Sequence, residues 1–127
     1  LGDVYKRQSY KLFLDDVRNP MDVKWVEMPL GPWVTVRNYD DFVKYITSNG
    51  LPEFVAFDHD LGQEHYITGK PKYDEYKEKT GYDCVKWLVE YCMDNNKLFP
   101  KYVVHSMNPI GKMNIIALIE NFNSTIK

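Results

Sequence analysis

The chain has 127 residues, and 44% of them are hydrophobic, which is enough for one domain with a buried core. Its formal net charge of −2 excludes an overall electrostatic attraction to duplex DNA, but it leaves room for a small nucleotide or an RNA end. No apolar run reaches the length of a membrane span, and Cys84 and Cys92 form neither a disulfide framework nor a CxxC site. We therefore expect a soluble cytoplasmic protein that binds neither duplex DNA nor a membrane.

The chain begins with a leader, a strand and a long loop. Residues 1–9 show no periodicity, and we expect a disordered or non-native leader followed by a single domain over residues 10–127. Residues 10–14 predict a strand, and Pro20 prevents a helix from starting directly after it. The proline-rich loop over residues 20–32 replaces the usual first crossover helix, and we expect it to be ordered, with one short extended piece.

Three further strands and three helices follow. The strands are predicted at residues 33–36, 54–57 and 102–104, and the helices begin after the capping residues Asn38, Thr80 and Asn108. The first two helices end near Asn49–Gly50 and Asn95–Asn96. Strands that alternate with helices imply right-handed crossovers, so we predict an α/β fold with a doubly wound parallel sheet. The expected architecture is receiver- or flavodoxin-like, with four strands in the order 2-1-3-4.

The segment over residues 63–79 is polar, charged and rich in tyrosine. It is longer than a typical connection between a strand and a helix. This segment is therefore either a binding loop over the site or a solvated surface insertion.

Polar residues follow three strands that this order places side by side. The three groups are Asp15-Asp16 after the first strand, Asp58-His59-Asp60 after the third and His105-Ser106 after the fourth. The carboxyl ends of parallel strands meet at one end of a sheet, and ligands of open α/β proteins bind there. The sequence therefore predicts one functional site built from these three groups.

The residue types in these groups indicate phosphoryl chemistry. The four carboxylates repel one another, so either a divalent cation such as Mg2+ lies among them or one acid stays protonated and acts as a general acid. His59 and His105 are suited to general acid–base catalysis because imidazole titrates near neutrality. A phosphate suits the start of the last helix and the side chains of Arg18, Ser106, Asn108 and Lys112.

Each feature also has a purely structural interpretation. Asp15 and Asp16 either bind a cation or form a turn with their own backbone. His105 is either a catalytic group or a core histidine with satisfied hydrogen bonds. Trp25 and Tyr66 either pack against the protein or stack on a nucleobase if the loops fold over the sheet.

Four motifs carry a resemblance to a known family. They are LFLDDVRNP (12–20), FDHDLG (57–62), TGYD (80–83) and HSMNPIG (105–111). Together they resemble the cyclic-phosphate-processing receiver-like family, an offshoot of the receiver fold of response regulators. The match extends from about Lys11 to Phe122, and the motifs occur in the expected order.

The resemblance implies roles for individual residues. In a receiver an acidic pair binds the metal, an aspartate accepts the phosphoryl group and a hydroxyl contacts it; the matching residues are Asp15-Asp16, Asp58 and Ser106. Asp60 matches the position whose backbone carbonyl reaches the metal. The lysine that ends the fifth strand of a receiver has no counterpart, since Lys112 lies at another place. This departure weakens the case for aspartyl phosphotransfer.

The resemblance further implies an activity, because the family is proposed to process cyclic phosphates such as ADP-ribose 1'',2''-cyclic phosphate or the 2',3'-cyclic ends of RNA. We expect a hydrolase, a cyclic phosphodiesterase, that works in RNA repair or in the processing of NAD derivatives. The expected catalytic residues are Asp16, Asp58, His59 and His105, the phosphate-binding residues are Arg18, Ser106, Asn108 and Lys112, and the metal ligands are Asp15, Asp16, Asp58 and Asp60. Two alternatives stay open, a non-catalytic sensor of nucleotides or phosphate and a degenerate receiver phosphoacceptor module.

Overall fold

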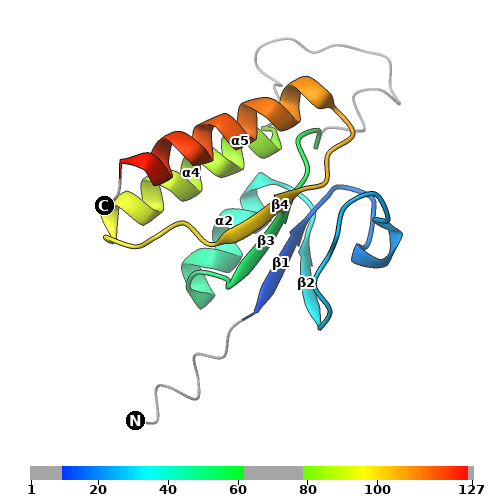
Figure 1. Ribbon diagram of the computed structural model, residues 1–127. Helices are drawn as coiled ribbons and strands as arrows, with labels where there is room; N and C mark the ends of the chain where they lie inside the picture. Colours follow the sequence, from blue (N-terminus) through cyan, green and yellow to red (C-terminus); the bar gives the residue numbers. More distant parts are fainter. Residues whose placement is uncertain (1–9, 62–78, 126–127) are drawn as a thin grey trace.

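The computed structural model describes residues 10–61 and 79–125, which form a four-stranded parallel sheet with three α-helices (Figure 1). The strand order is β2-β1-β3-β4, which confirms the predicted fold class and order. The strands are β1 (Lys11–Leu14), β2 (Trp33–Val36), β3 (Phe54–Phe57) and β4 (Lys101–Val104). The helices are α2 (Tyr39–Asn49), α4 (Gly81–Asp94), α5 (Pro109–Ser124) and the short 3-10 helix η1 (Pro20–Asp22).

The predicted leader and almost all of the polar segment over residues 63–79, with His65 and Tyr66, lie outside the described residues. Among the helices that the structure describes, none is long and apolar enough to cross a membrane. Cys84 and Cys92 are both buried free thiols in α4.

Each α-helix begins at the predicted cap. The side-chain oxygen of Asn38 accepts the N–H of Asp41 at 2.8 Å, and that of Asn108 accepts the N–H of Gly111 at 2.9 Å. Thr80 accepts the N–H of Tyr82, and Pro109 occupies the first turn of α5. Proline and capping side chains therefore determine where the helices start.

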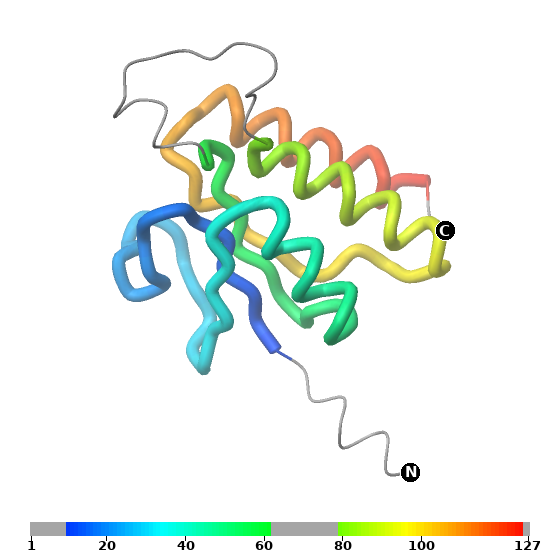
Figure 2. Tube along the Cα trace, turned by 180° about the vertical axis from the view of Figure 1, so that it is seen from behind, coloured from blue at the N-terminus to red at the C-terminus, as the bar shows by residue number. Residues whose placement is uncertain are grey.

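All three helices cover one face of the sheet, and the loop over residues 19–32 lies on the other side, away from α4 and α5 (Figures 1 and 2). Leu12 and Leu14 of β1 point toward the helices, whereas Phe13 between them packs against Val23 and the partly buried residues of the loop. The loop thus replaces the first crossover helix, as predicted.

The same loop contains one helical turn and no paired strand. Residues 20–22 form η1, and residues 23–32 contain no strand. Pro20 suits the first helical position, and the Asp22 carboxylate accepts the N–H of Asn19 at 2.8 Å. The proline and this hydrogen bond favour a helical turn at residues 20–22.

The register of the sheet aligns the ends of three strands. Phe13 lies opposite Ala56, and Phe57 lies opposite Val104. Continuing both pairings past the strand ends sets Asp15, Asp58 and His105 in one row. Side chains alternate along a strand, so this row points to the same face as Phe13 and Ala56, the face that the loop covers.

Candidate functional site

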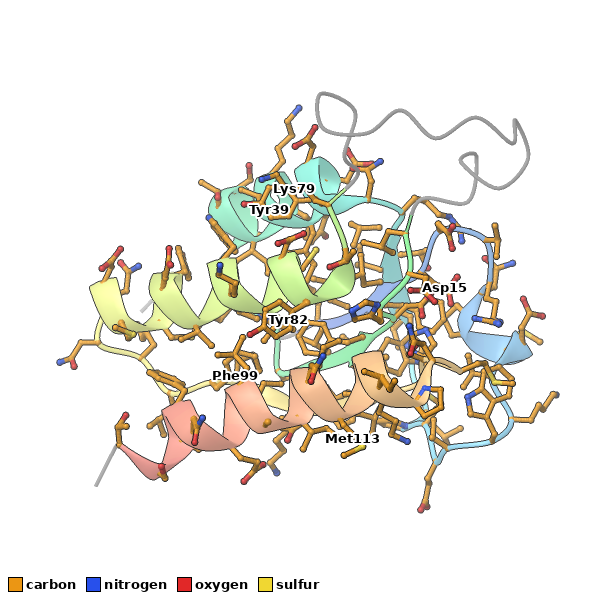
Figure 3. The ribbon with its side chains drawn as sticks, turned by 90° about the horizontal axis from the view of Figure 1, so that it is seen from above. Asp15, Tyr39, Lys79, Tyr82, Phe99 and Met113 are labelled. Carbon is orange, nitrogen blue, oxygen red and sulfur yellow. The ribbon has the colours of Figure 1, made fainter. Side chains whose placement is uncertain are left out.

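The row beyond the strand ends forms a compact buried group. Asp15 and His105 are fully buried and Asp58 is 5% exposed. One side-chain ligand atom from each of the three lies within 4.8 Å of the other two. Figure 3 shows Asp15 at the end of the sheet from which the loop leaves, away from Phe99, which lies just before β4. Residues distant in sequence are therefore brought together at the predicted end of the sheet.

The Asp15 carboxylate accepts four hydrogen bonds. Its Oδ1 accepts the backbone N–H groups of Val17 and Arg18 at 3.0 and 2.8 Å, so the predicted turn with its own backbone is present. Its Oδ2 accepts Nε2–H of His105 at 2.9 Å and Nη1–H of Arg18 at 3.2 Å. Burial alone would raise the pKa of Asp15, but the hydrogen bonds from His105, Arg18 and Val17 outweigh it and hold that pKa well below the usual range.

His105 is held on one ring face and at one nitrogen. Its ring stacks on Phe13 with centroids 4.7 Å apart and an angle of 6° between the planes. Its Nε2 bonds to Asp15, whereas its Nδ1 is buried and has no hydrogen-bond partner among the described residues. Nδ1 is therefore a buried polar atom whose hydrogen-bonding capacity the described residues leave unused. His105 thus resembles the core histidine of the structural interpretation, with one nitrogen left unsatisfied.

Asp58 has a different environment from Asp15. Its Oδ1 accepts the backbone N–H of His59 at 2.8 Å. Burial, and then the negative charge of Asp15, raise the pKa of Asp58 to about 6, although His105, His59 and Arg18 act in the opposite direction. Asp58 is therefore the acid of this group that changes its protonation state near neutrality.

A second histidine–aspartate pair lies beside the first. Nδ1 of His59 and Oδ1 of Asp60 are 2.9 Å apart, and the same Oδ1 accepts Nδ2–H of Asn108 at 3.3 Å. The His59 side chain is 18% exposed, and the Asp60 side chain is 52% exposed. If Nδ1 carries the proton that Asp60 accepts, Nε2 is the nitrogen left to exchange protons with a ligand.

Two glycines allow the helix starts to approach this pair closely. A Cβ at Gly111 would lie 2.4 Å from Cγ of His59, and a Cβ at Gly81 would lie 1.7 Å from the backbone oxygen of Asp58. Gly81 also donates its N–H to the backbone oxygen of His59 at 2.7 Å. The glycines of the TGYD and HSMNPIG motifs therefore let α4 and α5 pack directly against residues 58 and 59.

The other residues that the sequence predicted for the site lie outside the group formed by Asp15, Asp58 and His105. Ser106 is buried, and its Oγ accepts the N–H of Asn108 at 3.1 Å. Asp60 contacts His59 and Asn108 and does not join the group formed by Asp15, Asp58 and His105; neither does the half-buried Asp16. Lys112 is half-buried in the first turns of α5.

Two further residues contact the site. Arg37 was not predicted, and Trp25 was predicted without a fixed role. Arg37 follows β2 and donates to the backbone oxygens of Asp15 and Arg18 at 3.3 and 2.6 Å, which holds the loop after β1 in place. Trp25 donates its Nε1–H to the backbone oxygen of His105 at 2.8 Å. The sequence did offer one sign of Arg37, because this residue directly follows the second strand. The prediction considered only the ends of the other three strands.

The predicted magnesium ion can be tested against this geometry. A carboxylate offers about four acceptor positions, and N–H donors occupy four on Asp15. A cation at Oδ2 would also displace the guanidinium of Arg18, which already supplies a positive charge there. The arrangement at Asp15 therefore does not fit a directly bound Mg2+, which prefers unoccupied oxygen ligands.

The parallel sheet, its strand order and the polar group at its carboxyl end define a receiver-like α/β domain. A family model described as the cyclic-phosphate processing receiver domain matches residues 10–121, and the chain therefore belongs to this family. The resemblance drawn from the four motifs is thereby confirmed. Searches of curated proteins and of solved structures found no significant match.

Proposed function

We propose that this protein is a phosphoesterase that opens a cyclic phosphate by hydrolysis. The observation that carries the proposal is the pair of histidine–aspartate contacts at the ends of β3 and β4, beside the Arg18 guanidinium, in a chain of the cyclic-phosphate processing receiver family. Paired imidazoles and carboxylates are groups that transfer protons near neutral pH, and a guanidinium binds phosphate.

His59 is the proposed general acid. Its side chain is partly exposed, whereas His105 is fully buried, so of the two histidines only His59 is placed to touch a bound substrate. Asp60 accepts the proton on Nδ1 and orients the ring, which leaves Nε2 for proton exchange. Asn108 in turn orients Asp60 through a hydrogen bond from its side-chain amide.

Asp58 is the proposed general base. A pKa of about 6 leaves most of the carboxylate ionised at pH 7 while keeping it basic enough to accept a proton. Asp58 groups with Asp15 and His105, whereas the His59 ring packs against Gly111 of α5. We propose that the two residues act on opposite sides of the phosphorus atom. Such an arrangement suits in-line displacement at phosphorus.

The proposed step balances with water as the only co-reactant. Asp58 takes one proton from the attacking water while the oxygen of that water bonds to phosphorus. The bond from phosphorus to one ribose oxygen breaks, and His59 donates its Nε2 proton to that oxygen. The product is a phosphomonoester, and proton transfer through solvent restores both residues.

Arg18 is the proposed phosphate anchor. Its side chain is 33% exposed, and one of its five N–H groups is used on Asp15. Asn108 and Ser106 stand at the start of α5, where a helix N-terminus also favours an anion. Because His105 is buried, its proposed role is to position Asp15, which holds the loop that carries Arg18.

The test is phosphorus NMR of the purified protein with adenosine 2',3'-cyclic phosphate and with ADP-ribose 1'',2''-cyclic phosphate. We expect conversion of at least one of them to a monoester, with conversion lost in Asp58→Asn. Asp94→Asn is the matched control, because Asp94 is an exposed acid at the far end of α4. Absence of conversion by the unaltered protein would refute the proposal.

A second candidate is a sensor that binds a nucleotide without turnover. The burial of His105 favours it, since one of the two predicted catalytic imidazoles has no access to a ligand. Ligand-dependent line broadening without conversion in the same NMR samples would support this function. Labelling of Asp58 by acetyl phosphate would instead support a receiver-like phosphoacceptor.

A further inference from the structure

Trp25 belongs to the loop that covers the outer face of the sheet, and two contacts attach it to the site. Its indole N–H donates to the backbone oxygen of His105 at 2.8 Å. The guanidinium carbon of Arg18 lies 5.2 Å from the centroid of the indole ring. One edge of the ring and one ring face are therefore held by residues of the site.

Trp25 keeps a large part of its surface exposed. The residue is 42% exposed, whereas its neighbour Val23 is 6% exposed and packs with Phe13 and Ala56. A tryptophan usually contributes to stability by burying a large area, and this one leaves much of that area in solvent. A fixed aromatic ring with exposed surface beside a phosphate-binding arginine is the arrangement on which proteins stack nucleobases.

We propose that Trp25 stacks on the base of a nucleotide whose own ribose carries the cyclic phosphate. Arg18 contacts both Asp15 and Trp25, so a phosphate on its guanidinium and a base on the indole are close neighbours. This inference rests on the proposed function and narrows its substrate class.

The two candidate substrates differ in this respect. In a 2',3'-cyclic nucleotide, the base and the phosphate are attached to the same ribose. In ADP-ribose 1'',2''-cyclic phosphate, the ribose of the cyclic phosphate carries no base, and a pyrophosphate separates it from the adenine nucleoside. Stacking on Trp25 therefore selects a 2',3'-cyclic nucleotide, either free or at the end of an RNA.

The experiment compares Trp25→Ala and Trp25→Phe with the unaltered protein on base-bearing and base-free substrates. The substrates are adenosine 2',3'-cyclic phosphate, a short RNA with a 2',3'-cyclic end, ADP-ribose 1'',2''-cyclic phosphate and glycerol 1,2-cyclic phosphate. We expect Trp25→Ala to lower kcat/KM on the two base-bearing 2',3'-cyclic substrates by about 5- to 100-fold, with less than about two-fold change on glycerol cyclic phosphate. Trp25→Phe should recover most of the loss because it retains an aromatic ring.

Trp33→Phe is the matched control. Trp33 is a half-buried tryptophan of β2 that packs edge-on against Phe13 and Phe54, so its replacement should leave the ratio between the substrates unchanged. If Trp25→Ala lost as much activity on glycerol 1,2-cyclic phosphate as on adenosine 2',3'-cyclic phosphate, the proposal would be overturned. Such a result would show that Trp25 only supports Arg18. A larger loss on the RNA than on the free nucleotide would support it and identify an RNA end as the source of the base.

The failure of the proposed function is a separate result. If the unaltered protein turns over none of the four substrates, the phosphoesterase proposal fails, and titration calorimetry with the same compounds still tests the stacking. Weaker binding of adenosine 2',3'-cyclic phosphate to Trp25→Ala than to the unaltered protein would then support stacking. Equal binding to the two proteins would overturn it.

Discussion

His59 and His105 each contact an aspartate at 2.9 Å, yet they occupy very different environments. His105 is fully buried, stacks on Phe13 and bonds to an aspartate that is itself fully buried. The side chain of His59 is 18% exposed, and its aspartate is half in solvent. The same pairwise distance thus occurs in two environments that differ in solvent access, and this difference is why we propose a positioning role for His105 and proton transfer for His59.

The largest effect that would test this comparison is the loss of activity in His59→Gln. Glutamine keeps a polar side chain of similar length but cannot donate a proton at neutral pH, so we expect the hydrolysis rate to fall by about 10²- to 10⁴-fold. Steady-state kinetics on a 2',3'-cyclic nucleotide measure it, with circular dichroism as the control for folding. An unchanged rate in a folded variant would remove His59 from the mechanism.

Next in size is the loss of stability in His105→Ala. The change leaves a cavity beside Phe13 and removes one hydrogen bond from the buried Asp15 charge, so we expect a loss of about 3 kcal/mol in the free energy of unfolding. Urea denaturation measures it, and His59→Ala is the matched control because its ring is partly exposed and should cost less. Equal losses in the two variants would contradict the distinction between the pairs.

A smaller effect is expected from pH, through Asp58. Its pKa is raised to about 6 from 3.8, so the folded state binds a proton more tightly than the unfolded chain. The stabilising contribution is therefore fully present below about pH 4 and is lost as the pH rises through about 6. Hydrolysis should change in the opposite sense, rising across the same range as Asp58 ionises.

Asp58→Asn is the variant that isolates this titration. Urea midpoints of the variant and the unaltered protein, measured between pH 4.5 and 7.5, should show the protein losing stability relative to Asp58→Asn as the pH rises. A difference that stays constant over this range would show that Asp58 keeps an ordinary pKa.

The smallest expected effect is that of a metal chelator. Since Arg18 occupies the place beside Asp15 that a cation would take, EDTA should change the hydrolysis rate by less than about two-fold. The measurement is the NMR assay with EDTA and, separately, with added Mg2+. Loss of turnover in EDTA, restored by Mg2+, would show that an ion displaces Arg18 and would favour the metal site expected from the sequence.

Much of this organisation was predictable from the sequence. Asn38, Thr80 and Asn108 signal the helix starts because short polar side chains satisfy free N–H groups there. The alternation of strands and helices implies the parallel sheet, which in turn brings Asp15, Asp58 and His105 to one end. The loop replacing the first crossover helix was also predictable, from its prolines, although its 3-10 turn was not.

The partners within the site were not predictable. Asp60 was expected among the metal ligands, and the sequence did not indicate its contacts with His59 and Asn108. Arg37 was not considered at all, although it holds the loop after β1. Such contacts depend on side-chain rotamers and on the distance between elements, which periodicity and propensity do not specify.

The sequence by itself determined the elements of this protein, their order in the sheet and the polar residues at the strand ends, because caps, prolines and apolar runs act locally and right-handed crossovers restrict the topology. Only the tertiary structure decided which histidine is buried, which carboxylate is saturated with hydrogen bonds and where Trp25 lies. His105 and Asp15 are 90 residues apart in the chain, and their contact exists only once the register of three strands and the covering loop bring them together. Burial raises the pKa of Asp58 and hydrogen bonds lower that of Asp15, and both environments are properties of the assembled fold.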